Sequence, residues 1–274
     1  MIRPLTIAAA VAAIAAPALA APGAADWRIP DPENVLVIDT NKGRVVVELM
    51  PEVAPGHVTR VRELARAGLY DGRTFFRVID QFMAQTGDPK DDGTGGSEKE
   101  DLTGEFTWRR GANSMFSTVA KPSGAELGFV GAMPAMSQTT LLAAMTADRK
   151  VSAWGMFCPG VLGMARGDNP DSANSQFFIM RQAYPSLDKR YTAFGRTLSG
   201  LEAVRSIKTG EPVPAPQDVM QKVRVLADIP AGQRPSVRVV DTKSAWFLAE
   251  VERVKATRGA DFSPCDVDIL AEVK

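Results

Sequence analysis

The amino-acid sequence predicts a fold dominated by β-strands with a few helices. Short runs rich in Val, Ile and aromatic residues recur along the 274 residues, and Gly, Pro, Asn and Asp separate them. This pattern is typical of antiparallel strands joined by tight turns. Segments with a helical spacing of apolar residues are fewer and short. Charge is balanced at 32 basic and 32 acidic residues, so no basic face suited to nucleic acid is expected.

The N-terminus has the features of a cleavable secretory signal peptide, assigned to residues 1–20. A basic start precedes an apolar run over residues 5–16, and the small residues Ala18 and Ala20 fit the cleavage rule. The alternative is an uncleaved anchor, but the apolar run is short for a bilayer. For a bacterial chain, the signal predicts a periplasmic protein with no membrane contact after cleavage.

The mature chain is expected to start with a flexible leader, residues 21–34, which is rich in Ala, Pro, Gly and acidic residues. Two β-rich runs, residues 35–40 and 44–50, flank Asn-Lys-Gly and predict a hairpin. A helix is expected over residues 57–67, where apolar residues have helical spacing and a glycine follows. His57, the only histidine, falls in its first turn and is expected at the surface rather than in a catalytic triad.

Residues 97–160 form the irregular middle of the chain and hold five of its eleven methionines. Leu141, Leu142 and Met145 have helical spacing and predict a helix over residues 139–148. Two interpretations stay open for the methionines and the aromatic residues near them. They offer an adaptable apolar surface to other chains, or they pack the segment against the rest of the protein.

A short helix is expected over residues 200–207, and the chain continues after Pro230 into a C-terminal extension, residues 231–274. Residues 244–257 of the extension predict an amphipathic helix, and residues 267–273 a terminal strand or arm. The helix is expected to pack on its own chain, so a monomer is favoured. Further strands are expected over residues 74–79, 82–85, 161–166, 175–181, 191–198 and 222–229.

Cys158 and Cys265 are the only cysteines in the sequence. In an oxidising compartment they can form one disulfide, which would tie the extension to the middle of the chain. The alternative is two buried thiols, because the sequence does not show whether the two Cα atoms approach each other. Two cysteines and one histidine, far apart in sequence, make no structural zinc pattern.

Arg77 stands among aromatic and apolar residues, where a charged side chain needs an explanation. It extends its head to water, pairs with an acid, or serves a functional site. Three ordered blocks of sequence favour the functional site: Phe75 to Asp88 around Arg77, then residues 163–179, then residues 187–195. Together the blocks resemble the cyclophilins, a family of peptidyl-prolyl cis-trans isomerases.

The resemblance covers residues 35–230 and implies a closed eight-stranded antiparallel barrel with two or more capping helices. Residues 97–160 are then an enlarged, partly helical insert, and residues 231–274 an extension packed on the barrel. The resemblance also implies that Arg77 and Gln85 are catalytic. The apolar socket for proline would be formed by Phe82, Met83, Phe178, Leu187 and Tyr191. A neighbouring groove that bonds the peptide main chain would be lined by Ala165, Arg166 and Gln176.

The chemistry of the reaction agrees with this implied site. Rotation about a peptide bond faces a barrier of ~18–20 kcal/mol because resonance gives the bond double-bond character, and X-Pro bonds exchange slowly. A catalyst needs no metal or cofactor: it holds the proline ring and favours the twisted amide, whose nitrogen has regained its lone pair. An arginine is always protonated and offers several fixed donors, which suits the second task.

The sequence therefore predicts a prolyl isomerase that acts on proline-containing segments of unfolded exported proteins. The alternative is a non-catalytic, chaperone-like or scaffold protein that holds such chains. Arg77 disfavours this alternative, because a protein that only binds has no need for a charge in the pocket. A hydrolase is not supported, since no nucleophile and base can be paired in the sequence.

Overall fold

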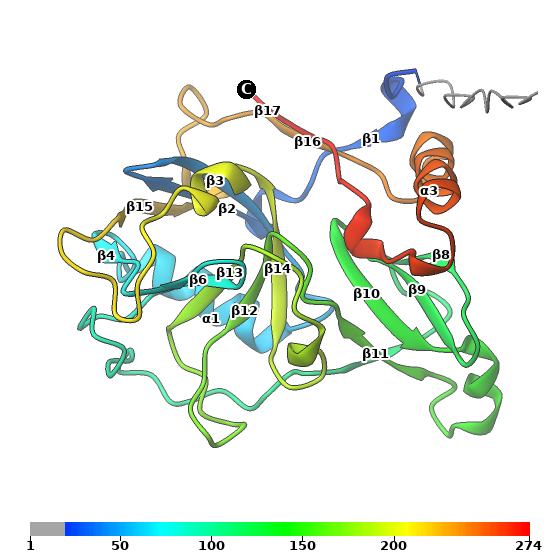
Figure 1. The fold of residues 1–274 in the computed structure, drawn as a ribbon, viewed down its shortest axis with the longest axis horizontal. Helices are drawn as coiled ribbons and strands as arrows, with labels where there is room; N and C mark the ends of the chain where they lie inside the picture. The colour runs from blue at the N-terminus through cyan, green and yellow to red at the C-terminus, as the bar shows by residue number, and fades with distance from the viewer. Residues whose placement is uncertain (1–19) are drawn as a thin grey trace, which may run out of the picture.

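The computed structural model describes residues 20–274, so the predicted signal peptide lies outside the described residues apart from Ala20. Three antiparallel sheets make up the fold (Figure 1). A nine-stranded sheet occupies the left of the view, a five-stranded sheet lies to its right, and a three-stranded ribbon crosses above both. The prediction of a β-dominated fold with few helices is confirmed. Within the described residues, no helix has the length and apolar character needed to cross a membrane.

The nine-stranded sheet is curled but not closed. Its outermost strands, β4 and β5, do not pair with each other, so the expected closed eight-stranded barrel is wrong. The physical reason is that β4 and β5 are successive pieces of one extended run, separated only by Phe75 and Phe76, so they form no ladder with each other; the outer edge of β5 is bonded instead to the segment of Gly210, which exchanges both backbone hydrogen bonds with Val78. In spatial order the strands are β4 (Arg73–Thr74), β15 (Val219–Val225), β2 (Val35–Thr40), β3 (Gly43–Leu49), β14 (Ala193–Ser199), β12 (Val161–Met164), β13 (Phe177–Met180), β6 (Met83–Thr86) and β5 (Arg77–Ile79).

Both faces of this sheet are buried, which explains why β2 is almost continuously apolar. Leu36 and Ile38 point into the core inside the curl, together with the apolar side of α1 (Pro55–Arg66) and Val204 of α2 (Leu201–Arg205). Val35 and Val37 point to the opposite face, into a second core shared with the insert and the extension. A strand buried on both faces loses the alternation of apolar and polar residues.

The insert is mainly a five-stranded sheet, and the expectation of a partly helical insert is corrected. Its only helical element in the described chain is the 3-10 helix η3 (Thr140–Met145), in place of the helix expected over residues 139–148. Gly124 and Gly131 have φ of +75° and +55° in the turns that join β8 to β9 and β9 to β10. In spatial order the strands are β7 (Trp108–Arg110), β11 (Val151–Gly155), β10 (Met133–Gln138), β9 (Ala125–Val130) and β8 (Phe116–Ala120).

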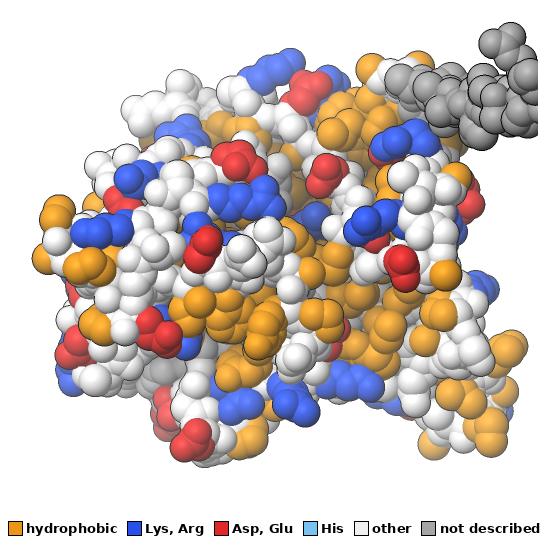
Figure 2. Space-filling view, in the orientation of Figure 1, with side chains coloured by type: hydrophobic (Ala, Val, Ile, Leu, Met, Phe, Trp, Pro, Cys, Tyr) orange, Lys and Arg blue, Asp and Glu red, His pale blue; other side chains and the backbone are white. Residues whose placement is uncertain are grey.

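The methionines of the insert divide between the two interpretations. Met133 is fully buried, in the core between the insert and the curled sheet. Met145 is 83% exposed and lies on η3 beside Leu141, which is 82% exposed. Packing therefore accounts for part of the Met-rich sequence but leaves an apolar tip in solvent. Figure 2 shows apolar side chains on this tip, at the lower right of the molecule.

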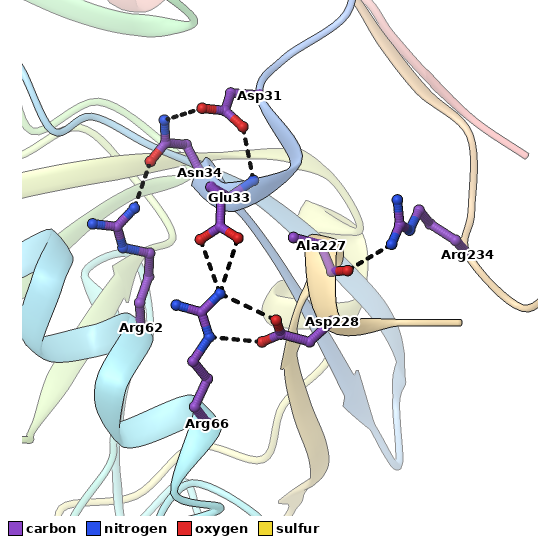
Figure 3. Close-up of polar contacts among 8 residues, drawn as sticks. All are labelled: Asp31, Glu33, Asn34, Arg62, Arg66, Ala227, Asp228 and Arg234. Carbon is purple, nitrogen blue, oxygen red and sulfur yellow. Dashed lines mark hydrogen bonds and ion pairs between the residues drawn. The ribbon is translucent and has the colours of Figure 1, made fainter. Parts of the chain in front are cut away.

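Residues 21–34 are ordered, which differs from the expected leader without regular structure. They form η1 (Ala24–Asp26), β1 (Trp27–Arg28) and η2 (Pro32–Asn34). Arg66 of α1 fixes this segment by binding Glu33 at 2.8 Å and Asp228 at 2.8 Å (Figure 3). The composition of residues 21–34 did not predict the order, because the partners lie about thirty and two hundred residues away.

The C-terminal extension packs on its own chain, against both the insert and the curled sheet. Strand β16 (Val237–Val240) pairs with β1 on one side and with β17 (Ala271–Val273) on the other. Helix α3 (Ala245–Arg258) buries Phe247 against Phe129 of the insert, with ring centroids 5.2 Å apart. Short 3-10 turns complete the chain: η4 (Pro185–Leu187), η5 (Leu226–Asp228), η6 (Gly259–Asp261) and η7 (Pro264–Asp266).

Cys158 and Cys265 form a disulfide, so the interpretation as two free thiols is wrong. The bond joins the segment after β11 to η7 of the extension. Cys158 is fully buried in the core between the curled sheet and the insert. The cross-link therefore closes the chain around this second core.

His57 is fully buried, so its expected place at the surface is wrong. Its Nδ1 lies 2.7 Å from Oε2 of Glu105, and the same carboxylate accepts hydrogen bonds from the backbone N–H groups of Gly56 and His57. Glu105 thus supplies the cap that Ala54, at the N-cap position of α1, has no side chain to make. The helix start was predicted from local sequence, but its burial depends on a loop about fifty residues further on.

Candidate active site

Arg77 is the first residue of β5 and lies in a row of three residues across the sheet. Gln85 of β6 is its partner in the strand register, and Oε1 of Gln85 accepts a hydrogen bond from Nη1 of Arg77 at 3.3 Å. On the other side, Oε1 of Glu211 accepts from Nε of Arg77 at 2.5 Å. The guanidinium is therefore held from two sides by neighbours in the sheet.

Beside Arg77 is a cavity of about 170 Å³. Its apolar wall is well packed: Met83 is 2% exposed and Phe178 is 5% exposed. The ring of Phe178 meets Tyr191 edge to face at 5.9 Å and stacks on Phe157 behind it at 5.9 Å. The cavity is lined by Arg77, Phe82, Met83, Gln85, Ala165, Arg166, Phe178, Leu187 and Tyr191. All nine lie outside the insert and the extension.

A second cavity of about 200 Å³ adjoins the first, and Gln85, Ala165 and Arg166 line both. Gln176 lies on its far side and connects it to Arg77. Nε2 of Gln85 donates to Oε1 of Gln176 at 3.0 Å, and Nε2 of Gln176 donates to the carbonyl oxygens of Gly93 and Gly95 at 3.1 and 2.8 Å. This chain of amides fixes the orientation of both glutamines and, through Gln85, of the guanidinium.

Arg166 lines both cavities and is held by backbone carbonyl groups. Its Nε and Nη2 donate to the carbonyl oxygen of Arg190 at 3.1 Å, and its Nη1 donates to the carbonyl oxygen of Gly167 at 2.8 Å. The guanidinium carbon lies 4.5 Å from the centroid of the Tyr191 ring. The guanidinium thereby secures Tyr191 against β12, and the role implied by the resemblance, bonding of the peptide main chain, stays a prediction.

Asp188 is the strongly perturbed acid next to the site. Burial raises its pKa to about 6, although the hydrogen bond from the backbone N–H of Phe157 and the charge of Lys189 both lower it. Oδ1 of Asp188 lies 2.9 Å from that nitrogen. Because Phe157 stacks on Phe178, the carboxylate holds the support of the cavity wall rather than facing the cavity itself.

Comparison with known proteins now decides the family. The family model described as cyclophilin type peptidyl-prolyl cis-trans isomerase/CLD matches residues 35–227. This chain belongs to the cyclophilins. It is therefore a peptidyl-prolyl cis-trans isomerase, and the cavity beside Arg77 is the candidate site for its substrate.

Individual relatives agree with this assignment. The chain is 36% identical over 191 residues to a protein of Brucella suis named probable peptidyl-prolyl cis-trans isomerase, covering 66% of this chain and 74% of that one. It is 32% identical over 190 residues to peptidyl-prolyl cis-trans isomerase B of Bacillus subtilis, covering 69% of this chain and 94% of the relative.

One solved structure extends the similarity beyond the family range. The cyclophilin AquaCyp293 from Hirschia baltica superposes with a TM-score of 0.83 at 33% identity, covering 90% of this chain and 93% of that one. Since the family match ends at residue 227, a coverage of 90% must include part of the C-terminal extension. The extension is therefore part of a fold that another cyclophilin shares.

The structure brings together the residues that the sequence singled out for the site of this cyclophilin. Nine of them line one cavity, and Gln176 binds Gln85 at its edge. Sequence reasoning missed Glu211, which belongs to none of the three blocks that carry the resemblance. It also missed Phe157 and Asp188, which support the wall from behind. No local pattern marks these three, because each acts through a partner distant in the sequence.

Proposed function

We propose that this cyclophilin accelerates rotation about X-Pro bonds by stabilising the twisted amide with the guanidinium of Arg77. The observation that supports this most is the arrangement of donors. Nε and one Nη1 hydrogen of Arg77 are bound by Glu211 and Gln85, while Nη2 makes no hydrogen bond within residues 20–274. A charged arginine with a donor to spare thus lines a cavity that has an apolar wall and a volume suited to a proline ring.

The physical argument is one of differential binding. In the planar amide the nitrogen lone pair is delocalised, and in the twisted amide it is localised and can accept a hydrogen bond. A donor aimed at that nitrogen, or at the adjoining carbonyl oxygen, binds the transition state more strongly than the ground state. One charge-assisted hydrogen bond is worth about 1.5–3 kcal/mol, which corresponds to roughly 10- to 150-fold in rate.

Cis-trans exchange of a short X-Pro peptide tests this proposal. We expect the wild type to accelerate exchange, and Arg77→Ala to lose roughly 10- to 150-fold in kcat/KM. Arg77→Lys keeps the charge but lacks the rigid planar fork that Glu211 and Gln85 hold from two sides, so an intermediate loss is expected. Arg253→Ala is the matched control, because Arg253 is an exposed arginine of α3, paired with Glu250 away from the cavity. An Arg77→Ala variant as active as the wild type would contradict the proposal.

We further propose that the substrates are unfolded exported proteins and that the enzyme works in the periplasm. Two observations support this: the signal-like features of residues 1–20, and the disulfide between Cys158 and Cys265, a bond that persists in oxidising compartments. Cell fractionation against cytosolic and periplasmic markers checks the location. N-terminal sequencing of the isolated protein should begin at Ala21. A protein found in the cytosol with an intact N-terminus would rule the proposal out.

One observation favours a second function, the holding of unfolded chains. Leu141 and Met145 expose 82% and 83% of their surfaces on η3 at the tip of the insert. Exposed methionine and leucine side chains adapt to varied apolar partners. Such a function would work alongside isomerisation, because the insert does not line the cavity.

A further inference from the structure

Glu211 is tied to Arg77 by the backbone as well as by its side chain. The segment of Gly210 lies antiparallel to β5, with N–H to O distances of 2.8 Å in both directions between Val78 and Gly210. The backbone N–H of Val213 also donates to the carbonyl oxygen of Phe76 at 2.9 Å. In this register Glu211 is the cross-strand neighbour of Arg77 on the side opposite Gln85. Opposite charges at directly opposed positions on antiparallel strands attract each other.

The contact made by Glu211 uses only one edge of the guanidinium. Oε1 accepts from Nε at 2.5 Å, and no bond joins Glu211 to Nη2 in the described chain. Arg44 gives a useful contrast: Asp39 takes both its Nε and its Nη2, at 2.6 and 3.2 Å, and covers that whole side of the group. A paired contact of that kind at Arg77 would consume Nη2, the donor that the proposed function assigns to the substrate. The contact made by Glu211 leaves that donor available.

We propose that Glu211 is a positioning residue for Arg77, a role that rests on the proposed function of Arg77. Together with Gln85, it fixes the rotation of the guanidinium about the side chain, so that Nη2 meets the prolyl amide without reorganisation. The side chain of Arg77 is 36% exposed and that of Glu211 is 56% exposed. Surrounding packing therefore does little to hold the arginine, and its polar partners must do so. Donors fixed before the reaction are the more effective ones.

The proposal predicts a specific split in kinetics. Glu211 does not line the cavity, so its removal leaves the apolar contacts with the proline ring in place and KM nearly unchanged. A guanidinium of Arg77 that is no longer oriented stabilises the twisted amide less well, which lowers kcat. Glu211→Ala is expected to lower kcat roughly tenfold, in keeping with the effect of misplacing a catalytic group. Glu211→Gln retains an oxygen that accepts from Nε, so it should stay within about threefold of the wild type.

The test combines peptide exchange with NMR of ¹⁵N-labelled arginine. The variants are Glu211→Ala and Glu211→Gln, each made with Arg77 present and with Arg77→Ala. Glu202→Ala is the control, since Glu202 is an exposed glutamate that pairs with Arg205 on α2. We expect Glu211→Ala to have no further effect once Arg77 is removed. We also expect the Nε–H signal of Arg77 to shift in Glu211→Ala, while the amide signals of Val78 and Gly210 keep their wild-type positions.

Three results would overturn the inference. One is a Glu211→Ala variant as fast as the wild type or faster, since the glutamate would then be neutral or a competitor of the substrate. Another is an equal loss of kcat in Glu211→Gln and Glu211→Ala, together with shifted NMR signals of the backbone amides of Val78 and Gly210. Glu211 would then support the backbone rather than orient Arg77. The third is an effect that persists without Arg77. Failure of the proposed function is seen separately: Arg77→Ala would then keep full activity, although the Nε–H signal of Arg77 in the wild type still reports the ion pair with Glu211.

Discussion

Two of the roles that the sequence allowed for Arg77, pairing with an acid and service in a functional site, apply together. Arg77 pairs with an acid, Glu211, and it also lies at the edge of an apolar cavity. Pairing alone would have made it a structural residue. Whether Arg77 is structural or functional depends on which of its N–H groups are bound by Glu211 and Gln85. The sequence does not show this. The cavity members were predictable as a set, because their order along three blocks matches a family. Glu211 belongs to none of those blocks.

Asp188 provides a pH-dependent test at the residue scale. Because burial raises its pKa from 3.8 to about 6, the folded protein binds this proton more tightly than the unfolded chain does. The stabilising contribution is complete below about pH 3.8 and is lost as the pH rises through about 6. Asp188→Asn cannot ionise and can still accept from the N–H of Phe157. We therefore expect the melting temperature of the variant, relative to wild type, to increase as the pH rises from 4 to 7.

The control for this titration is Asp168→Asn, because Asp168 lies in an exposed loop and its carboxylate makes no hydrogen bond in the described chain. Its melting temperature should follow that of the wild type across the same range. If the difference in melting temperature between Asp188→Asn and the wild type stays constant from pH 4 to 7, Asp188 keeps its ordinary pKa.

At the scale of elements, the sequence predicted segments with local signals and missed those held by distant partners. The hairpin of β2 and β3, helix α1 and helix α3 follow from alternation, helical spacing and turn residues. The insert was interpreted as partly helical because Leu141, Leu142 and Met145 have helical spacing. In the structure this spacing makes one exposed 3-10 turn, while the sheet around it depends on pairing between strands. Residues 21–34 likewise become ordered only through pairing with β16 and through Arg66.

The tip of the insert gives a test at this scale. Replacing Leu141 and Met145 together by Ser removes exposed apolar surface without touching the cavity. We expect the double variant to suppress aggregation of an unfolded protein less well than the wild type. Its exchange rate on a short X-Pro peptide should be unchanged. Ala144→Ser is the control, because Ala144 is exposed on the same turn and its replacement leaves Leu141 and Met145 in place. If the wild type and the double variant suppress aggregation equally well, this tip does not hold unfolded chains.

At the scale of the whole molecule, two cores share one sheet. The core inside the curl belongs to the cyclophilin fold, while the second core joins the outer face of the sheet to the insert and the extension. The division into a cyclophilin-like part, an insert and an extension was a prediction from the sequence. The sequence did not predict that the extension covers the insert, because the apolar face of a helix does not identify the surface that receives it. It likewise predicted one strand over residues 74–79, which the structure divides into β4 and β5 at the two ends of the sheet.

The disulfide should matter for the stability of this assembly and little for its chemistry. It joins residues 107 positions apart, and a cross-link over such a loop typically contributes about 2–5 kcal/mol. The double variant Cys158→Ala/Cys265→Ala is therefore expected to unfold at a lower denaturant concentration. Peptide exchange by the folded variant should stay close to that of the wild type, since neither cysteine lines the cavity. Reduction of the wild type should give the same loss of stability, and no loss on reduction would contradict this role.

The most direct test of the central claim separates binding of the proline from acceleration of its rotation. NMR exchange spectroscopy of an X-Pro peptide, saturating with enzyme, gives the interconversion rate of the bound peptide, and a titration gives its affinity. For Arg77→Ala we expect an affinity within about threefold of the wild type, because the apolar wall is intact, and a bound-state rate at least tenfold lower. A variant that binds the peptide and interconverts it as fast as the wild type would show that the socket alone is the catalyst and that Arg77 is not needed.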